Sequence, residues 1–197
     1  MKDIKIIALD MDGVINSSEL IQKWIDDKWK IEEQNPNNLT DEDIRLAVRK
    51  AYQEEFVHCE ELVFPELAEK ITKIVNETGC YILWTSTWRR LERYKNIEDA
   101  KEMFNRRGLP GDKLIAYTQS IGFAWNSNHC RGTEIKYWIQ DNNEYNILKC
   151  AVIDDRVDAG MNLPHCAQYF FIEDGITDND VINIINYLNT DKNNDEN

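Results

Sequence analysis

The chain has 197 residues, of which 42% are hydrophobic and 30% charged, with a formal net charge of −13. This acidic balance argues against extended binding to a nucleic-acid duplex, which requires many phosphates to be neutralised, but a few basic residues in a pocket could still hold one phosphate. No apolar stretch approaches the ~20 residues that span a bilayer, no signal peptide is visible, and the cysteines are odd in number and spread out, so we expect a cytoplasmic protein with reduced thiols.

The first predicted element is a buried strand at residues 6–9 that ends in two carboxylates, Asp10 and Asp12. Ligands of open α/β sheets bind at the carboxyl ends of the strands, where Asp10 stands, and Gly13 lets the backbone turn away beside a substrate. Two acids so close repel each other unless a cation lies between them or they share a proton. The pattern therefore predicts a site at this strand end.

The next segment, residues 16–62, has helical rather than strand-like periodicity. Its length is typical of a lid over a site, although its helices could instead only cover the edge of the sheet. Four aromatic residues in it could stack on a base or simply pack: Trp24, Trp29, Tyr52 and Phe56.

We expect one α/β core made of residues 1–15 and 63–190, with residues 16–62 inserted as a small helical cap. The polar, acidic residues 191–197 are typical of a disordered tail.

A helix beginning at Pro65 and ended by Gly79 leads into a second buried strand, residues 80–84. Thr85 and Ser86 follow this strand and precede a polar, basic helix predicted over residues 88–107. Hydroxyl and N–H groups at the start of a helix suit phosphate binding. Most arginines of this helix should face solvent, but Arg89, one turn from the hydroxyls, is placed to reach a ligand.

Beyond a short strand at residues 114–117, Arg131 opens another helix. A cation is unfavourable at a helix start, so its presence suggests a nearby anion. A third buried strand, residues 150–153, ends in Asp154 and Asp155. Two parallel strands that bring carboxylates to the same sheet edge form an all-oxygen site suited to Mg²⁺. A last strand at residues 169–172 and a helix at 177–188 complete the pattern.

Four motifs in this order resemble those of the haloacid-dehalogenase (HAD) superfamily: Asp10-Met11-Asp12-Gly13-Val14, Thr85-Ser86, Arg131 and Asp154-Asp155. The segments 82–89, 131–138 and 174–177 look like the branch of these domains associated with RNA-repair proteins. Residues 152–156 also resemble polynucleotide 3′-phosphatases and 5′(3′)-deoxyribonucleotidases. The resemblance implies an α/β fold, with a Rossmann-like doubly wound parallel sheet and a small helical cap after the first strand.

The resemblance also implies a Mg²⁺-dependent phosphomonoesterase. Asp10 would attack phosphorus to form an aspartyl-phosphate, and Asp12 would protonate the leaving oxygen and then activate water. The metal ligands would be Asp10, Asp12 through its backbone carbonyl, Asp154 and, in an outer position, Asp155. The phosphate-binding residues would come from Thr85, Ser86, Arg89, Arg131 and Lys136. The family usually has Lys in its third motif, so either Arg131 or Lys136 could supply that cation.

The substrate class stays open between a nucleotide or nucleic-acid terminal phosphate and a small metabolite such as a sugar phosphate. A module that binds phosphate without catalysis is a further alternative. Asp12 favours a phosphatase over a dehalogenase, because dehalogenation has no leaving oxygen to protonate. The sequence does not predict an oligomeric state.

Overall fold

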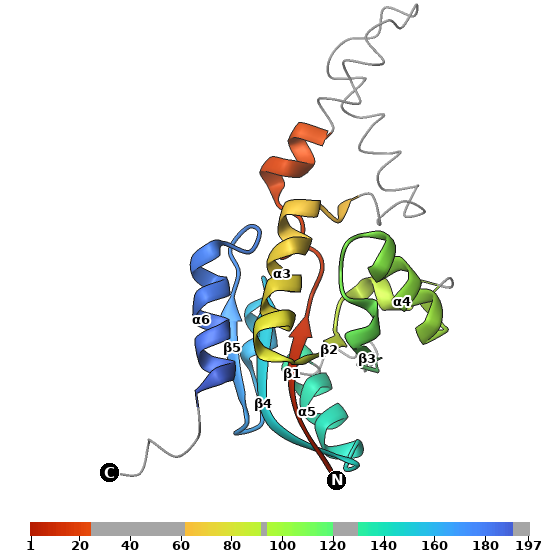
Figure 1. Cartoon of the computed structure of the whole chain (residues 1–197), viewed down its shortest axis with the longest axis vertical. Coiled ribbons are helices and arrows are strands. Elements are labelled where there is room, and N and C mark those ends of the chain that lie inside the picture. The colour runs from red at the N-terminus through yellow and green to blue at the C-terminus, as the bar shows by residue number, and fades with distance from the viewer. Residues whose placement is uncertain (25–61, 92–93, 120–129, 191–197) are drawn as a thin grey trace, which may run out of the picture.

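The structure is a computed structural model that describes residues 1–24, 62–91, 94–119 and 130–190. Within these ranges five strands form one all-parallel sheet in the order β3-β2-β1-β4-β5 (Figure 1). The strands are β1 (Lys2–Leu9), β2 (Tyr81–Trp84), β3 (Leu114–Tyr117), β4 (Tyr145–Asp154) and β5 (Ala167–Phe171). The predicted α/β, Rossmann-like parallel sheet is therefore confirmed.

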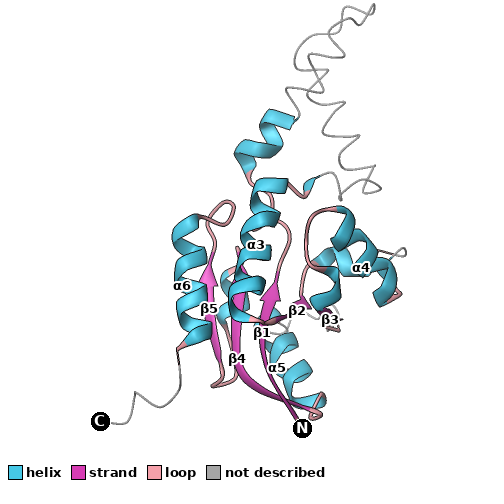
Figure 2. Cartoon of the chain, in the orientation of Figure 1, coloured by secondary structure: helices cyan, strands magenta, loops and turns pink. Residues whose placement is uncertain are grey.

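Helices cover both faces of this sheet (Figure 2). They are α3 (Pro65–Thr78), α4 (Ile97–Arg106), α5 (Arg131–Asp141) and α6 (Asp178–Asn189). Side chains of β1 alternate between two cores: Ile7 and Leu9 pack with α3, α4 and α6, whereas Ile6 and Ala8 pack with α5. Because both faces are covered, the central strands read as nearly continuous apolar runs in the sequence.

Two helices, α3 and α6, begin at local sequence signals. Pro65 begins α3, and Gly79, with a positive φ of 67°, ends it. A capping box begins α6, in which Thr177 and Asp180 each bind the other's backbone N–H. These local contacts explain why the two helices could be located from the sequence.

The single helix predicted over residues 88–107 is wrong. The chain instead forms a short 3₁₀ helix, Thr87–Arg90, and then, after an extended Leu91, the separate helix α4. The Asn96 side chain accepts a hydrogen bond from the Glu98 N–H and so caps the start of α4. This internal cap is the signal that the prediction overlooked.

Two distant parts of the sequence meet where the predicted insert begins and ends. The Phe64 N–H donates to the Ile15 carbonyl at 3.2 Å. Residues 18–24 are helical, and Trp24 packs partly buried against the core, in agreement with a packing role. The rest of the predicted cap, including Trp29, Tyr52 and Phe56, and the predicted tail lie outside the described residues.

Two further sequence expectations concern the described residues. The four described cysteines, Cys80, Cys130, Cys150 and Cys166, are free thiols. None of the described helices has the length and apolar character that crossing a bilayer requires.

Candidate active site

Side chains that follow the strands meet at the carboxyl edge of the sheet. Leu9 pairs in register with Trp84 and Ile153. The parallel pairing extends one residue beyond Leu9: the Asp10 N–H donates to the Ile153 carbonyl at 3.1 Å, and the Thr85 backbone N–H donates to the Leu9 carbonyl at 2.9 Å. Asp10, Thr85 and the last residue of β4, Asp154, are all buried. The register thus brings the motifs of three strands together.

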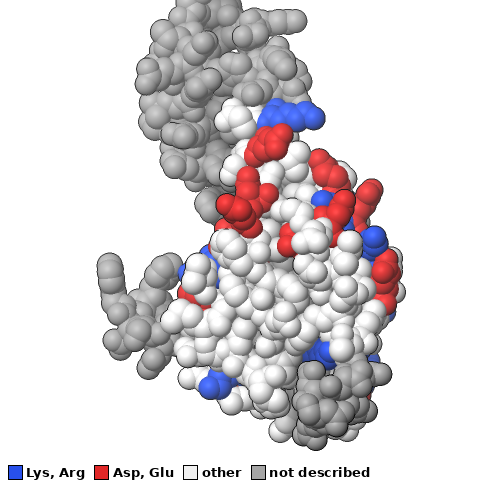
Figure 3. Space-filling view, turned by 90° about the vertical axis from the view of Figure 1, so that its left-hand side faces the viewer, with Lys and Arg blue, Asp and Glu red and all other residues white. Residues whose placement is uncertain are grey.

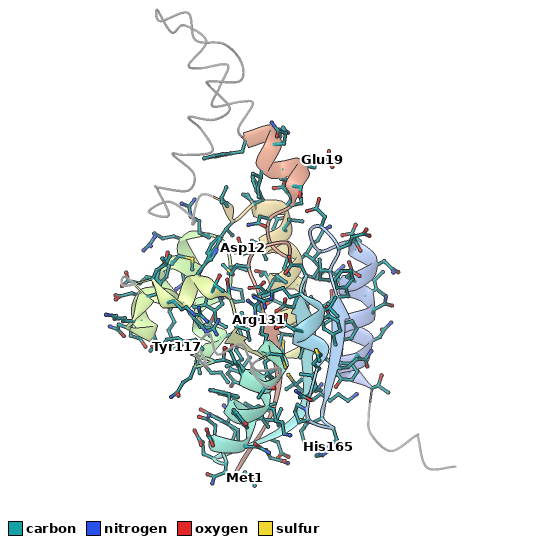
Figure 4. All side chains as sticks on the ribbon, turned by 180° about the vertical axis from the view of Figure 1, so that it is seen from behind. Met1, Asp12, Glu19, Tyr117, Arg131 and His165 are labelled. Carbon is teal, nitrogen blue, oxygen red and sulfur yellow. The ribbon has the colours of Figure 1, made fainter. Side chains whose placement is uncertain are left out.

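Arg131 reaches this edge from the first turn of α5. Its Nη1 lies 2.7 Å from Asp10 Oδ2 and 2.7 Å from Asp154 Oδ2. Figure 4 shows Arg131 and Asp12 toward one end of the sheet, with Met1 at the other. The anion that the sequence suggested near this helix start therefore includes two carboxylates of the protein itself.

One cation does not balance the acids gathered here. Asp10, Asp154 and Asp155 each offer an oxygen within 4.8 Å of the others. Burial and the Asp10 charge raise the pKa of Asp154 to about 7, and the same two causes raise the pKa of Asp155. Burial alone would lower the pKa of Arg131, but the charges of Asp10 and Asp154 outweigh it and raise that pKa. The cluster therefore favours a further cation.

The donor set fits Mg²⁺, which takes one or two carboxylates and keeps several waters. The Oδ1 atom of Asp10 is buried and has no hydrogen-bond partner in the described structure. An unsatisfied buried polar group costs about 1–3 kcal/mol, and more when it is charged. A bound cation or a substrate group beside Oδ1 would remove that cost.

The two hydroxyls that follow β2 have different surroundings. Thr85 Oγ1 is buried and, like Asp10 Oδ1, has no partner among the described residues. Ser86 Oγ accepts a hydrogen bond from the Trp88 N–H at 3.4 Å and caps the 3₁₀ helix. Thr85 is therefore the hydroxyl that is available to a ligand, whereas Ser86 shapes the loop.

Arg89 is placed differently from the prediction that it reaches a ligand. Its Nε donates to the Thr118 carbonyl at 2.8 Å, and its Nη1 donates to the carbonyls of Ser86, at 2.6 Å, and Thr85. Its Nη2 forms a 2.6 Å ion pair with Glu134, and the Arg89 side chain is only 3% exposed. Arg89 thus ties the loop to α5, because the loop turns this side chain inward.

Lys136 lies five residues after Arg131 in α5 and is half-buried. It makes no ion pair with any described carboxylate, whereas Arg131 contacts both buried acids directly. The geometry favours Arg131 over Lys136 as the cation of the third motif.

Asp12 lies just beyond the end of β1 and is half-buried. Its Oδ2 accepts a hydrogen bond from Trp88 Nε1 at 2.8 Å, and its Oδ1 accepts one from Asn16 Nδ2 at 3.2 Å. Burial raises the pKa of Asp12, and although these hydrogen bonds oppose the shift, the Asp10 charge adds to it. A carboxyl group with a raised pKa is suited to donating a proton to a leaving group.

The turn after Asp12 depends on glycine. Gly13 has a φ of +71°, and a Cβ at this position would lie 2.6 Å from Asp155 Oδ2. Only a residue without a side chain lets the Asp12 turn approach Asp155 so closely.

A family model describing the HAD domain in Swiss Army Knife RNA repair proteins matches residues 6–181, from β1 into α6. The chain belongs to this family. No curated protein and no solved structure gives a match. The predicted resemblance to the HAD superfamily and its RNA-repair branch is confirmed, and membership supports a hydrolase of the phosphatase type.

Sequence reasoning gave no role to four residues that shape the site of this HAD domain: Asn16, Trp88, Thr118 and Glu134. Glu134 carries a weak signal, because an acid in the first turn of a helix complements the dipole. Asn16 makes local contacts, with Gly13 and Asp12 in the same turn. Trp88 and Thr118 carry no signal, since they contact Asp12 and Arg89, which are distant in the sequence. Their contacts depend on the tertiary structure.

Proposed function

We propose that this HAD domain is a Mg²⁺-dependent phosphomonoesterase that removes a terminal phosphate from a nucleotide or a nucleic-acid end. The observation that carries the proposal is a pair of buried oxygens without partners, Asp10 Oδ1 and Thr85 Oγ1, on neighbouring strand ends beside Arg131. A nucleophile, a hydrogen-bond donor and a cation at one sheet edge are the groups that phosphoryl transfer requires.

The reaction would proceed in two steps. In the first, Asp10 Oδ1 forms a bond to phosphorus, the bond from phosphorus to the leaving oxygen breaks, and that oxygen takes a proton from neutral Asp12. In the second, water loses a proton to Asp12 and displaces Asp10 from phosphorus. Thr85 and Arg131 would hold the phosphoryl oxygens.

The candidate metal ligands are Asp10, Asp154 and Asp155, together with the Asp12 backbone carbonyl. When bound there, Mg²⁺ would neutralise charge on the phosphoryl group and help to orient it.

Membership of an RNA-repair family supports a phosphorylated nucleic-acid or nucleotide substrate. The net charge of −13 favours a small ligand or a chain end over an extended duplex. Figure 3 agrees, since acidic side chains gather at one end of the face that it views. We therefore infer that the domain recognises the terminal phosphate and its immediate neighbourhood.

We also propose that residues 1–15 and 63–190 form the core and that residues 16–62 are inserted as a cap over the site. The hydrogen bond between Phe64 and Ile15 supports this division, because it places the two ends of the insert side by side. Limited proteolysis tests it: cleavage should fall within residues 16–62 and leave the two core segments associated. Cleavage that first separates β4 from β1 would contradict the division.

A phosphatase panel tests the proposed activity. Nucleoside monophosphates or short 3′-phosphorylated oligonucleotides should be hydrolysed better than sugar phosphates, EDTA should abolish turnover, and Mg²⁺ should restore it. Preference for sugar phosphates would remove the nucleic-acid part of the proposal. If inorganic phosphate binds but no ester is hydrolysed, including a generic aryl phosphate, the domain is a non-catalytic phosphate-binding module.

A further inference from the structure

Both oxygens of the Asp12 carboxyl group are held by N–H donors, one from the turn that follows Asp12 and one from the segment that follows β2. The indole Nε1 of Trp88 lies 2.8 Å from Oδ2, and Nδ2 of Asn16 lies 3.2 Å from Oδ1. Trp88 is 2% exposed and Asn16 is 1% exposed, so both donors are fixed by packing. The carboxyl group therefore has a set orientation although Asp12 itself is only half-buried.

Neither partner can take a proton from Asp12. An indole nitrogen is a donor only, and so is the amide nitrogen of asparagine. The amide oxygen of Asn16, Oδ1, accepts a hydrogen bond from the Gly13 N–H at 2.7 Å, which fixes which way the amide faces. The two nitrogens that bind Asp12 thus cannot accept its proton. The proton is directed to the side of the carboxyl group that neither nitrogen occupies.

Trp88 also belongs to the loop that presents Thr85. Ser86 accepts a hydrogen bond from the Trp88 backbone N–H, and the Trp88 carbonyl accepts one from the Leu91 N–H at 3.0 Å. The residue that orients Asp12 and the hydroxyl proposed to hold the phosphoryl group are therefore parts of one short segment. Any shift of that segment would move both together.

We propose that Trp88 is a positioning residue for Asp12: its indole N–H holds the carboxyl group so that the proton goes to the leaving oxygen of the substrate. This inference rests on the proposed function and adds to it a residue outside the four motifs, within the segment 82–89 that resembles the RNA-repair branch. Trp88 touches no reacting atom and acts through Asp12. Its effect should therefore appear only where the leaving oxygen needs a proton.

The test compares two esters with different leaving groups. An aryl phosphate with a good leaving group needs little protonation, whereas an alkyl phosphate depends on it. General acid catalysis is worth roughly 10²–10⁴-fold, so Trp88→Phe should lower kcat/KM for the alkyl ester by roughly 10-fold or more and for the aryl ester by less than about 3-fold. We use kcat/KM because it reports the first, proton-donating step.

Trp84→Phe is the matched control. Trp84 is also a fully buried tryptophan of this region, but its indole Nε1 has no hydrogen-bond partner among the described residues. This variant loses the same ring atoms without losing a bond to Asp12, so it should leave the ratio of the two kcat/KM values unchanged. Equal losses on both esters in Trp88→Phe would show a merely structural role and overturn the inference.

A second readout does not need activity. In ¹H–¹⁵N spectra the Trp88 indole resonance is identified by its absence in Trp88→Phe, and Asp12→Ala should move it upfield because the bond to a carboxylate is lost. The Trp84 indole resonance should stay in place. An unmoved Trp88 resonance would overturn the inference while the phosphatase proposal stands, whereas a wild-type protein inactive on both esters would remove the proposed function and the positioning role with it.

Discussion

Two buried arginines, Arg89 in the segment after Thr85 and Arg131 at the start of α5, have different surroundings. Arg131 shares one Nη1 atom between Asp10 and Asp154, so two acids compete for a single cation. Arg89 has its own carboxylate, Glu134, and backbone carbonyls for its remaining donors. Around Arg131, negative charge remains for a ligand to balance, whereas the donors of Arg89 are bound by the protein itself. Arg131 is therefore suited to binding a ligand, and Arg89 to holding the structure.

Replacing Arg89 should cause the largest change, a loss of stability. Arg89→Ala should lower the free energy of unfolding by about 3–5 kcal/mol, because it removes the cation that pairs with the buried Glu134 and the donor that binds several carbonyls. Chemical denaturation measures this loss, and Arg89→Lys should recover part of it. A variant that keeps its stability but has a raised KM would instead place Arg89 at the substrate, as the sequence predicted.

The next effect is on the rate. Arg131→Ala should lower kcat roughly 10²–10³-fold, as expected when a group that stabilises transition-state charge is lost. Lys136→Ala, on the same helix and without an ion pair, is the matched control and should change kcat by less than about 3-fold. Steady-state kinetics with one aryl phosphate compares them. The reverse ranking would make Lys136 the cation of the third motif.

The smallest expected change is in how strongly Mg²⁺ stabilises the protein at different pH values. In the metal-free protein the pKa of Asp154 is raised to about 7 by burial and by Asp10. A raised carboxyl pKa means that the folded state binds the proton more tightly than the unfolded chain, so its contribution to stability is full below pH ~4 and is lost as pH rises through about 7. Mg²⁺ prefers the ionised site, so its stabilising effect should grow over the same range.

Thermal unfolding in EDTA and in Mg²⁺, from pH 5 to 8, measures the stabilisation by Mg²⁺ at each pH. At a Mg²⁺ concentration 100 times Kd the stabilisation at pH 8 should be about 2.7 kcal/mol, and much less at pH 5. Asp154→Asn should lose both the pH dependence and the Mg²⁺ effect. A Mg²⁺ effect that is equal at pH 5 and pH 8 would move the metal away from Asp154.

Strand ends could be predicted from the sequence because each apolar run stops at a polar residue. The buried runs before Asp10, Thr85 and Asp154 locate three strands, and parallel pairing then brings their ends together. Arg131 could be predicted for a similar reason, because a cation at a helix start is unfavourable without an anion. The family motifs fall on these positions.

Side-chain direction in the loop could not be predicted in the same way. Arg89 and Trp88 are adjacent, yet one turns toward Glu134 and the other toward Asp12. The cap at Asn96 is a local signal for the start of α4, but it does not show where Trp88 and Arg89 turn. Their contacts with Asp12 and Glu134 join positions far apart in the chain and leave no local periodicity.

The proposed mechanism requires that Asp10 becomes covalently phosphorylated. The most direct measurement is acid quenching of the protein during turnover of a phosphate-labelled aryl ester, whose leaving oxygen needs little protonation, followed by mass spectrometric mapping of the modified residue. We expect phosphate on Asp10, more of it in Asp12→Asn, where the second step lacks its base, and none in Asp10→Asn, which should also be inactive. Phosphate on another residue, or turnover by Asp10→Asn, would contradict this mechanism.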